Sequence, residues 1–156
     1  LANEETQASA RCLVIGSKKL LLHAMQYPGI MPLEIHIVER PDEGDYRQGI
    51  LNLIDLDNID MNQFRVGQVS GMCGKAAYDY IEKCIELANA RLVDAVATSP
   101  INKESLKAGG IPYIGHTEIF GALTHTADPL TLFEVRNLLL QGVLLQFQLR
   151  NVSINF

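Results

Sequence analysis

The feature that most constrains the fold is the alternation of strand-like and helix-like segments along the chain. Residues 11–16 form a short apolar run that ends at Gly16, and Ser17 is a favourable N-cap for a helix that continues through Met25. Strands that alternate with helices imply a largely parallel sheet covered on both faces. We therefore expect an α/β fold.

Two further strands are predicted in the first half of the chain. Residues 33–37 alternate apolar and polar side chains, which is typical of a strand with one covered face. Residues 50–56 form another apolar run, and the acidic segment 41–45 between the two runs predicts a loop. We interpret the aspartates that follow as a solvated turn, because they lack the glycine and terminal glutamate of a calcium loop: Asp55, Asp57 and Asp60.

The second half predicts a helix, a strand, a loop and a short helix. Residues 71–89 place small or apolar side chains on one helical face: Cys73, Ala77, Ile81, Cys84 and Ala88. Residues 92–97 suit a buried strand, and residues 98–103 would then form a loop beyond its carboxyl end, where ligands collect in such sheets. Residues 104–108 predict a short helix that stops at a pair of glycines.

Composition excludes several classes of function. The chain has 156 residues, which is enough for one domain with a core, and its formal net charge of −5 disfavours a nucleic-acid partner while leaving small anionic substrates open. No apolar stretch reaches the ~18 residues of a membrane span. Cys12, Cys73 and Cys84 lack the spacing of a disulfide framework or a zinc site, which favours the reducing cytoplasm. Cys73 and Cys84 are expected in the core.

A candidate phosphate site follows the short helix. With Thr117 as N-cap, a helix over 118–123 would leave free backbone N–H groups beside the His116 imidazole and the Thr117 hydroxyl. Lys103 and Asn102 lie on the expected rim, where the Lys103 ammonium is a possible phosphate contact. The alternatives are a plain cap, a packing histidine and a solvated lysine, and for an isolated G-H-T-E tetrapeptide they are the commoner case.

A longer motif changes that balance. The sequence TSPINKESLKAGGIPYIGHTE at 98–118 resembles the pattern [TS]-x-P-[IV]-[NH]-K-x-x-[LI]-x-x-A-G-x-x-x-x-G-H-T-E of the 4-hydroxythreonine-4-phosphate dehydrogenase (PdxA) family. The resemblance extends to GQVSGMCGKAAYDYIE at 67–82 and to residues 128–131. Residues 1–137 resemble part of a PdxA domain, and residues 138–156 form an atypical apolar C-terminal segment of the same domain.

The resemblance implies a fold and an activity. Members of this family form homodimers of three-layer α/β/α subunits, similar to isopropylmalate and isocitrate dehydrogenases, and oxidise a small phosphorylated hydroxy acid with NAD or NADP and a divalent metal (zinc, magnesium or cobalt). The implied substrate is 4-phosphohydroxy-L-threonine, in pyridoxal phosphate biosynthesis, or 4-phospho-threonate or 4-phospho-erythronate. His116 and Thr117 match substrate-binding positions of the family, whereas no catalytic or cofactor-binding residue is assigned.

The chain also departs from the family pattern. The glycine-rich segment of the family precedes Leu1, the nucleotide half with two metal histidines would follow Phe156, and Asn151 stands where the third metal histidine is expected. We therefore expect an incomplete fold whose natural start lies upstream, and a chain that alone neither holds the metal well nor reduces NAD(P). Residues 138–156 are so apolar that we expect them to pack against the core or a dimer partner.

Two functional hypotheses remain open on these grounds. The first is an oxidoreductase of the PdxA type that lacks much of its active site, and the second is a catalytically inactive phosphate-binding or dimerising α/β fragment. The remaining histidines have no partner at metal-ligand spacing and are interpreted as structural or solvent-facing: His23, His36 and His125.

Overall fold

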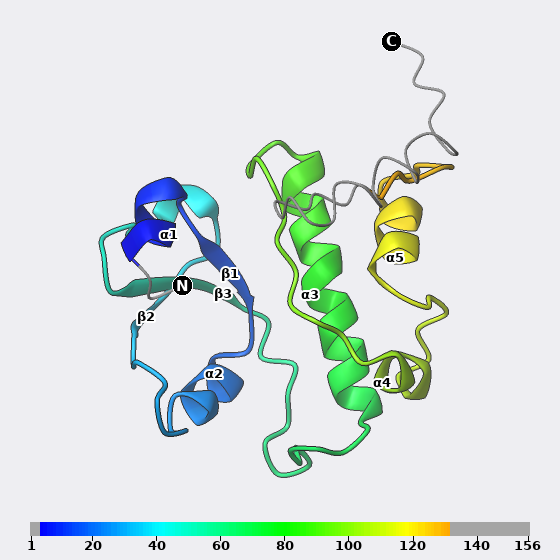
Figure 1. Ribbon diagram of the computed structural model, residues 1–156, viewed down its shortest axis with the longest axis horizontal. Coiled ribbons are helices and arrows are strands. Elements are labelled where there is room, and N and C mark those ends of the chain that lie inside the picture. Colours follow the sequence, from blue (N-terminus) through cyan, green and yellow to red (C-terminus); the bar gives the residue numbers. More distant parts are fainter. Residues whose placement is uncertain (1–3, 132–156) are drawn as a thin grey trace, which may run out of the picture.

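The computed structural model describes residues 4–131, which form a strand half and a helix half (Figure 1). Three strands lie with the first two helices on one side, and the last three helices lie on the other. The elements follow one another as α1 (Glu4–Ser9), β1 (Leu13–Gly16), α2 (Lys18–Ala24), β2 (Glu34–Ile37), η1 (Pro41–Glu43), β3 (Ile50–Asp55), α3 (Gly71–Asn89), α4 (Lys103–Ala108) and α5 (His116–Leu123).

The described sheet is parallel, which confirms the predicted fold class. Its strand order is β1-β3-β2, and the central strand β3 pairs with both neighbours, for example Asn52 with Leu13 and with His36. Four consecutive residues of β3 are buried, and Leu53 is completely inaccessible. A strand buried on both faces reads as a continuous apolar run rather than an alternating one, and β3 follows that rule except at Asn52.

The predicted covered face of β2 forms only in part, because Leu33 and Ile35 are half-buried whereas Ile37 is exposed. The strand itself forms, but Glu34, His36 and Ile37 are exposed, and Ile37 keeps 43% of its surface accessible. β2 lies at the edge of the described sheet, so it has one hydrogen-bonded neighbour there and shares little of the cover that protects β3. Alternation in the sequence showed the strand but not whether an element packs on it.

The strand β3 is joined to the start of α2 by a carboxylate. Ser17 caps α2 as predicted, with its hydroxyl accepting from the Leu20 N–H at 3.5 Å. The Asp55 carboxylate accepts from the Lys18 N–H at 3.0 Å and from the Asp57 N–H at 3.1 Å. The predicted turn after β3 is therefore an ordered connection, although Asp57 itself is exposed.

Helix α3 is the helix of its half that lies next to the strands, and its ends agree with the prediction. The buried positions differ from the predicted face, because only Ile81 of that face is buried and the other four positions are partly exposed. The reason is that α3 packs in two directions. Ile81 and Ile85 contact Leu106 and Ile119, whereas Leu87 packs with a second cluster around Ile54.

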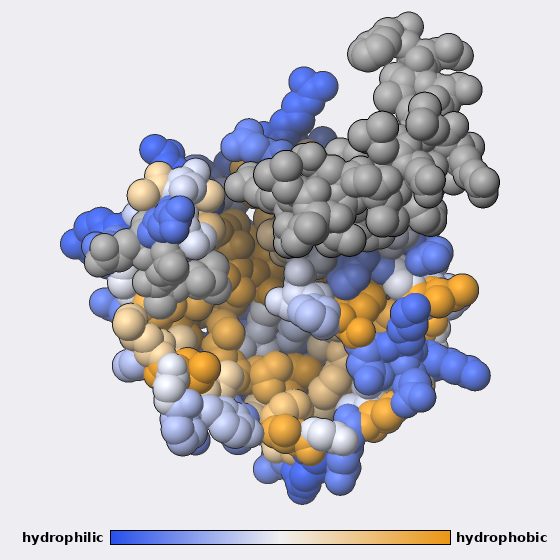
Figure 2. All heavy atoms as spheres, viewed as in Figure 1, coloured by the Kyte–Doolittle hydropathy of each residue, from blue (hydrophilic) through white to orange (hydrophobic). Residues whose placement is uncertain are grey.

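These two clusters form a large part of the core of the described residues. Leu106 and Ile119 are fully buried, and each such side chain contributes about 1.5–3 kcal/mol to stability by leaving water. Figure 2 shows hydrophobic residues gathered in the middle of one face, with hydrophilic residues around its margin. The cluster on Leu106 and Ile119 anchors α4 and α5 to α3, so these three helices form one packed unit.

The strand predicted at residues 92–97 does not form. The segment is irregular and largely accessible, with Leu92 46% exposed, and neither edge of the described sheet pairs with it. A strand needs a hydrogen-bonded neighbour, which an apolar run alone does not supply. The loop at 98–103 therefore follows an irregular segment instead of a strand end, and the argument that placed it at a carboxyl edge of the sheet was wrong.

Some expectations concern residues beyond this description. The apolar segment 138–156 and the comparison of Asn151 with a metal histidine lie outside the described residues. Within residues 4–131, none of the helices combines the length and the apolar character that a bilayer crossing requires.

Candidate functional site

Two glycines of α3 bring the backbone of α4 into direct contact. A Cβ on Gly74 would lie 1.9 Å from the Ser105 carbonyl oxygen, and one on Gly71 would lie 2.6 Å from the Ala108 carbonyl oxygen. Only glycine permits such an approach. The buried Ser105 hydroxyl also accepts from the Ser70 N–H at 3.2 Å, so α4 is held against the start of α3 by contact and by a hydrogen bond.

Helix α4 places Lys103 at its first position. The Asn102 side chain is the N-cap, and its Oδ1 accepts from the Ser105 N–H at 2.8 Å. Asn102, which the sequence placed on the rim of the site, is therefore engaged in capping. Lys103 is exposed, and its ammonium has no ion-pair partner within the described residues.

The loop before α5 rests on an aromatic pair. Tyr113 stacks on Tyr78 of α3 with ring centroids 6.0 Å apart and planes 13° from parallel. Burial, and next the hydrogen bond to Glu82, raise the pKa of Tyr78 to about 12, so this phenol stays neutral at physiological pH. The stack holds the backbone immediately before Ile114 and thereby the entry to α5.

The helix α5 begins two residues earlier than predicted. Gly115 is its N-cap and makes no side-chain hydrogen bond, so Thr117 is an exposed residue of the first turn and not the cap. A glycine cap has no side chain to occupy the first N–H groups, and the first intrahelical bond runs from the Ile119 N–H to Gly115. The N–H groups of His116, Thr117 and Glu118 are therefore available to a ligand within the described structure.

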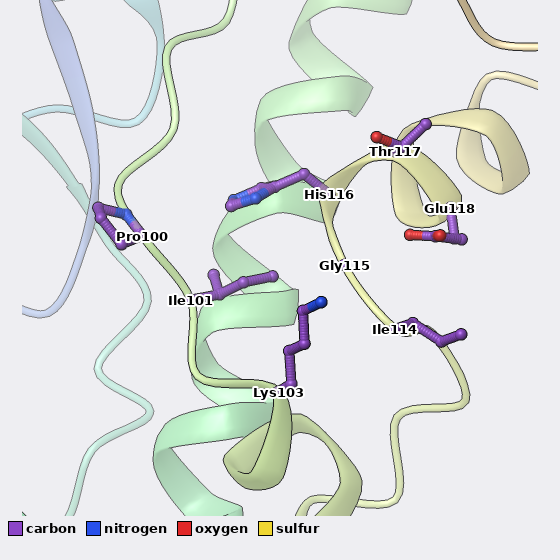
Figure 3. A pocket seen from close by; sticks show the side chains of 8 residues that line it. All are labelled: Pro100, Ile101, Lys103, Ile114, Gly115, His116, Thr117 and Glu118. Atoms are coloured by element: carbon purple, nitrogen blue, oxygen red, sulfur yellow. The ribbon is translucent and has the colours of Figure 1, made fainter. Parts of the chain in front are cut away.

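His116 has a buried nitrogen without a partner. Its Nε2 atom is inaccessible to solvent and makes no hydrogen bond with the described residues. Figure 3 shows the imidazole directed toward Pro100 and Ile101, while the Thr117 side chain points away from it. The expected convergence of the imidazole and the Thr117 hydroxyl is not seen, because the two side chains leave adjacent positions of a helix in different directions.

The residues before α4 and before α5 enclose one open hollow of about 460 Å³ (Figure 3). This volume lies within the range of small-molecule sites. Lys103 extends from one wall toward Gly115 on the other. The lining residues are Pro100, Ile101, Lys103, Ile114, Gly115, His116, Thr117 and Glu118.

The chemistry of this hollow suits a tetrahedral anion. Free N–H groups at a helix start carry partial positive charge, and Lys103 adds a full charge. The His116 Nε2 has no partner among the described residues, and it could donate to, or accept from, a ligand oxygen once the contacts that cover it open. Glu118 is the one lining carboxylate, and its negative charge opposes an anion at this helix start.

Sequence reasoning missed five members of this lining: Pro100, Ile101, Ile114, Gly115 and Glu118. Pro100, Ile101 and Ile114 provide an apolar wall, and Ile114 keeps 65% of its surface accessible. Glu118 was noted only as part of the motif. Their adjacency to Lys103 and His116 in the sequence was the available signal, but only the folded chain brings the two segments together.

The other titratable candidates make local contacts. The His36 Nε2 lies 3.3 Å from the Glu43 carbonyl oxygen, and His23 packs edge-on against Tyr27 and Phe64. Burial raises the pKa of the Cys84 thiol, which disfavours a reactive thiolate. Within residues 4–131 there is no group of three or more histidine, cysteine or carboxylate side chains placed to hold a metal ion.

Comparisons with known proteins agree on one family. The family model described as "Pyridoxal phosphate biosynthetic protein PdxA" matches residues 8–155. A Fusobacterium nucleatum protein named "Putative D-threonate 4-phosphate dehydrogenase" is 57% identical over 126 residues, which are 81% of this chain and 38% of the relative. A Clostridium botulinum protein with the same name is 44% identical over 99% of this chain and 44% of the relative.

Solved structures give the same result. A 4-hydroxythreonine-4-phosphate dehydrogenase from Burkholderia phymatum matches with a TM-score of 0.76 and 41% identity, over 81% of this chain and 38% of that one. Another from Klebsiella pneumoniae matches with a TM-score of 0.72 and 33% identity, over 74% and 35%. The chain thus spans less than half the length of the proteins it matches.

Proposed function

This chain belongs to the PdxA family, whose matched relatives are named as dehydrogenases, and from that premise we propose that it supplies the phosphate-binding part of an oxidoreductase acting on a small phosphorylated hydroxy acid. The observation that carries the proposal is the hollow at the start of α5. It combines free helix N–H groups, the unpartnered His116 nitrogen and the unpaired Lys103 ammonium on facing walls. Three such donors suit a phosphate better than a neutral ligand.

The proposed substrate carries its phosphate on carbon 4. The names of the relatives disagree about the rest of the molecule, since one is a threonate and the other a hydroxythreonine, but both end in a 4-phosphate. A site that recognises the shared end would serve either substrate. We place D-threonate 4-phosphate first, because the more similar curated relatives bear that name.

Each element of the site has one role in this proposal. The N–H groups of Thr117 and Glu118 and the Lys103 ammonium hold phosphate oxygens, and the His116 Nε2 bonds either a phosphate oxygen or the hydroxyl next to it. The Thr117 side chain points away from the His116 imidazole, so its hydroxyl contributes less than its backbone N–H. The apolar wall of Pro100, Ile101 and Ile114 excludes water from one side of the bound phosphate.

The proposed dehydrogenase uses NAD or NADP and a divalent metal, zinc, magnesium or cobalt, and works as a cytoplasmic homodimer, as the family resemblance implies. The described residues do not fit the metal, because residues 4–131 assemble no set of three ligands for it. We therefore assign to this chain the binding and orientation of the phosphorylated end, and no step at the oxidised carbon.

Calorimetric titration with inorganic phosphate tests the site. We expect the wild-type chain to bind, and His116→Ala combined with Thr117→Val to bind several-fold more weakly, since a buried nitrogen partner is lost. Ser17→Ala is the control, because it removes a cap far along the chain from the hollow. Equal affinity in the double variant and the wild type would exclude this site.

Turnover tests the activity separately. Two proteins are assayed for NAD or NADP reduction with D-threonate 4-phosphate and added metal. One is this chain alone, and the other is a longer family member that includes the same segment. Reduction by the longer protein that disappears with His116→Ala supports the dehydrogenase proposal. Phosphate binding without reduction by the longer protein would instead favour an inactive phosphate-binding module.

A further inference from the structure

We propose that Asn102 is a positioning residue for anion binding, which acts by holding Lys103 in place and does not itself touch the ligand. This inference rests on the function proposed above and goes further, because it assigns the affinity of the site partly to a residue that is committed to capping. The observation behind it is a continuous set of hydrogen bonds that runs from α3 to the wall of the hollow.

The hydrogen bonds begin at the start of α3. Ser70 caps α3 through its hydroxyl, which accepts from the Cys73 N–H at 3.3 Å, and its own N–H donates to the Ser105 hydroxyl at 3.2 Å. The Ser105 N–H in turn donates to the Asn102 Oδ1 at 2.8 Å. One buried serine thus connects the caps of two helices, and Asn102 is the last member of the series.

Lys103 is the residue that this series controls. It follows Asn102 directly and is the first residue of α4, so the cap determines where its backbone leaves the loop. Its side chain extends across the hollow toward Gly115 without an ion pair in the described structure. On a frayed helix end the backbone of Lys103 would itself move, whereas the cap fixes the backbone position from which its side chain extends into the hollow.

Packing against α3 holds the body of α4 in place. The Ser105 carbonyl oxygen lies against the backbone of α3 at Gly74, and Leu106 is completely buried. The body of α4 is therefore fixed by packing, and only its first turn depends on Asn102. Removing the cap should free Lys103 while leaving the rest of the helix in place.

A double-mutant cycle on the 156-residue chain, with inorganic phosphate as the probe, tests this. We expect Asn102→Ala to weaken binding by roughly fivefold, the size of a typical cap interaction. Asn102→Ser should restore affinity, because serine supplies a capping oxygen. In the Lys103→Met background the same Asn102→Ala change should have no effect, since the residue it positions is already gone. Ser17→Ala, which removes the α2 cap, should lower stability without changing phosphate affinity.

The outcomes of this cycle distinguish a positioning role of Asn102 from direct contact with the ligand. Loss of affinity with Asn102→Ala that persists in the Lys103→Met background would show that Asn102 contacts the ligand itself, and would overturn the proposal. Unchanged affinity in Asn102→Ala, with binding by the wild type, would also overturn it while leaving the phosphate site standing. If the wild-type chain binds no phosphate at all, the proposed function fails and this inference fails with it.

Discussion

Gly74→Ala should destabilise the chain strongly, although alanine is the better helix former. In a helix interior this exchange would by itself stabilise by about 0.5–1 kcal/mol. Here the new Cβ would lie 1.9 Å from the Ser105 carbonyl oxygen, 2.2 Å from its carbonyl carbon and 2.6 Å from the Leu106 nitrogen, all of them backbone atoms. Backbone has no alternative rotamer, so the two helices must move apart.

The size of the effect follows from that movement. Restoring ordinary contact requires a shift of about 1.5 Å, which weakens the packing of Leu106 and Ile119 and the Ser70 to Ser105 hydrogen bond. Overpacking costs about 1–3 kcal/mol and the hydrogen bond about 1 kcal/mol more. The net loss is about 2–3 kcal/mol, or a fall in Tm of roughly 5–10 °C for a chain of this length.

Thermal and urea unfolding followed by circular dichroism measure the change. Gly16→Ala is the matched control, because its Cβ would meet Leu53 at 3.8 Å, an ordinary contact. We expect Gly74→Ala to unfold well below both the wild type and this control. A Tm for Gly74→Ala at or above that of Gly16→Ala would refute the argument that the two backbones touch.

Four further outcomes are expected. Glu118→Gln should strengthen phosphate binding, by calorimetry, because it removes the one carboxylate lining the hollow; weaker binding would mean that Glu118 serves the ligand. Burial raises the pKa of Tyr80 from 10.0 to about 12, so the stability that its neutral phenol contributes is fully present below pH 10 and declines as the pH rises toward 12. Tyr80→Phe should therefore flatten the loss of folding stability between pH 10 and 12. An unchanged dependence of stability on pH would contradict this. A chelator should leave phosphate affinity unchanged, and the 156-residue chain alone should not reduce NAD(P) with added metal; turnover by a chain of verified mass would disprove the second expectation.

Local patterns were enough for elements that depend on neighbours in the sequence. The cap at Ser17, the strand that becomes β3 and both ends of α3 were predicted, because caps and helical or apolar periodicity act within a few residues. The motif at 98–118 also indicated the family, which the comparisons confirm. His116 and Thr117 were named from the expected helix start and from this motif, Lys103 was named from its expected place on the rim, and all three line the hollow.

Other features depended on partners distant in the sequence. Residues 92–97 have the composition of a strand but find no strand neighbour in the described sheet, and β2 has the alternation of a half-buried strand but lies at an edge. The start of α5 moved to His116 because Gly115 takes the capping position. The side-chain directions of His116 and Thr117 follow from that shift.

The sequence by itself determined the alternating elements, the family and the candidate residues of the site. These depend only on residue type and on the order of neighbouring residues. Only the tertiary structure decided that the loop before α4 faces the start of α5, that Asn102 is occupied as a cap, and that Glu118 and Ile114 join the site. The physical reason is long-range packing on α3: glycines at 71 and 74 let the backbone of α4 approach it, and Ile119 packs α5 against the same helix, so both walls of the hollow rest on α3.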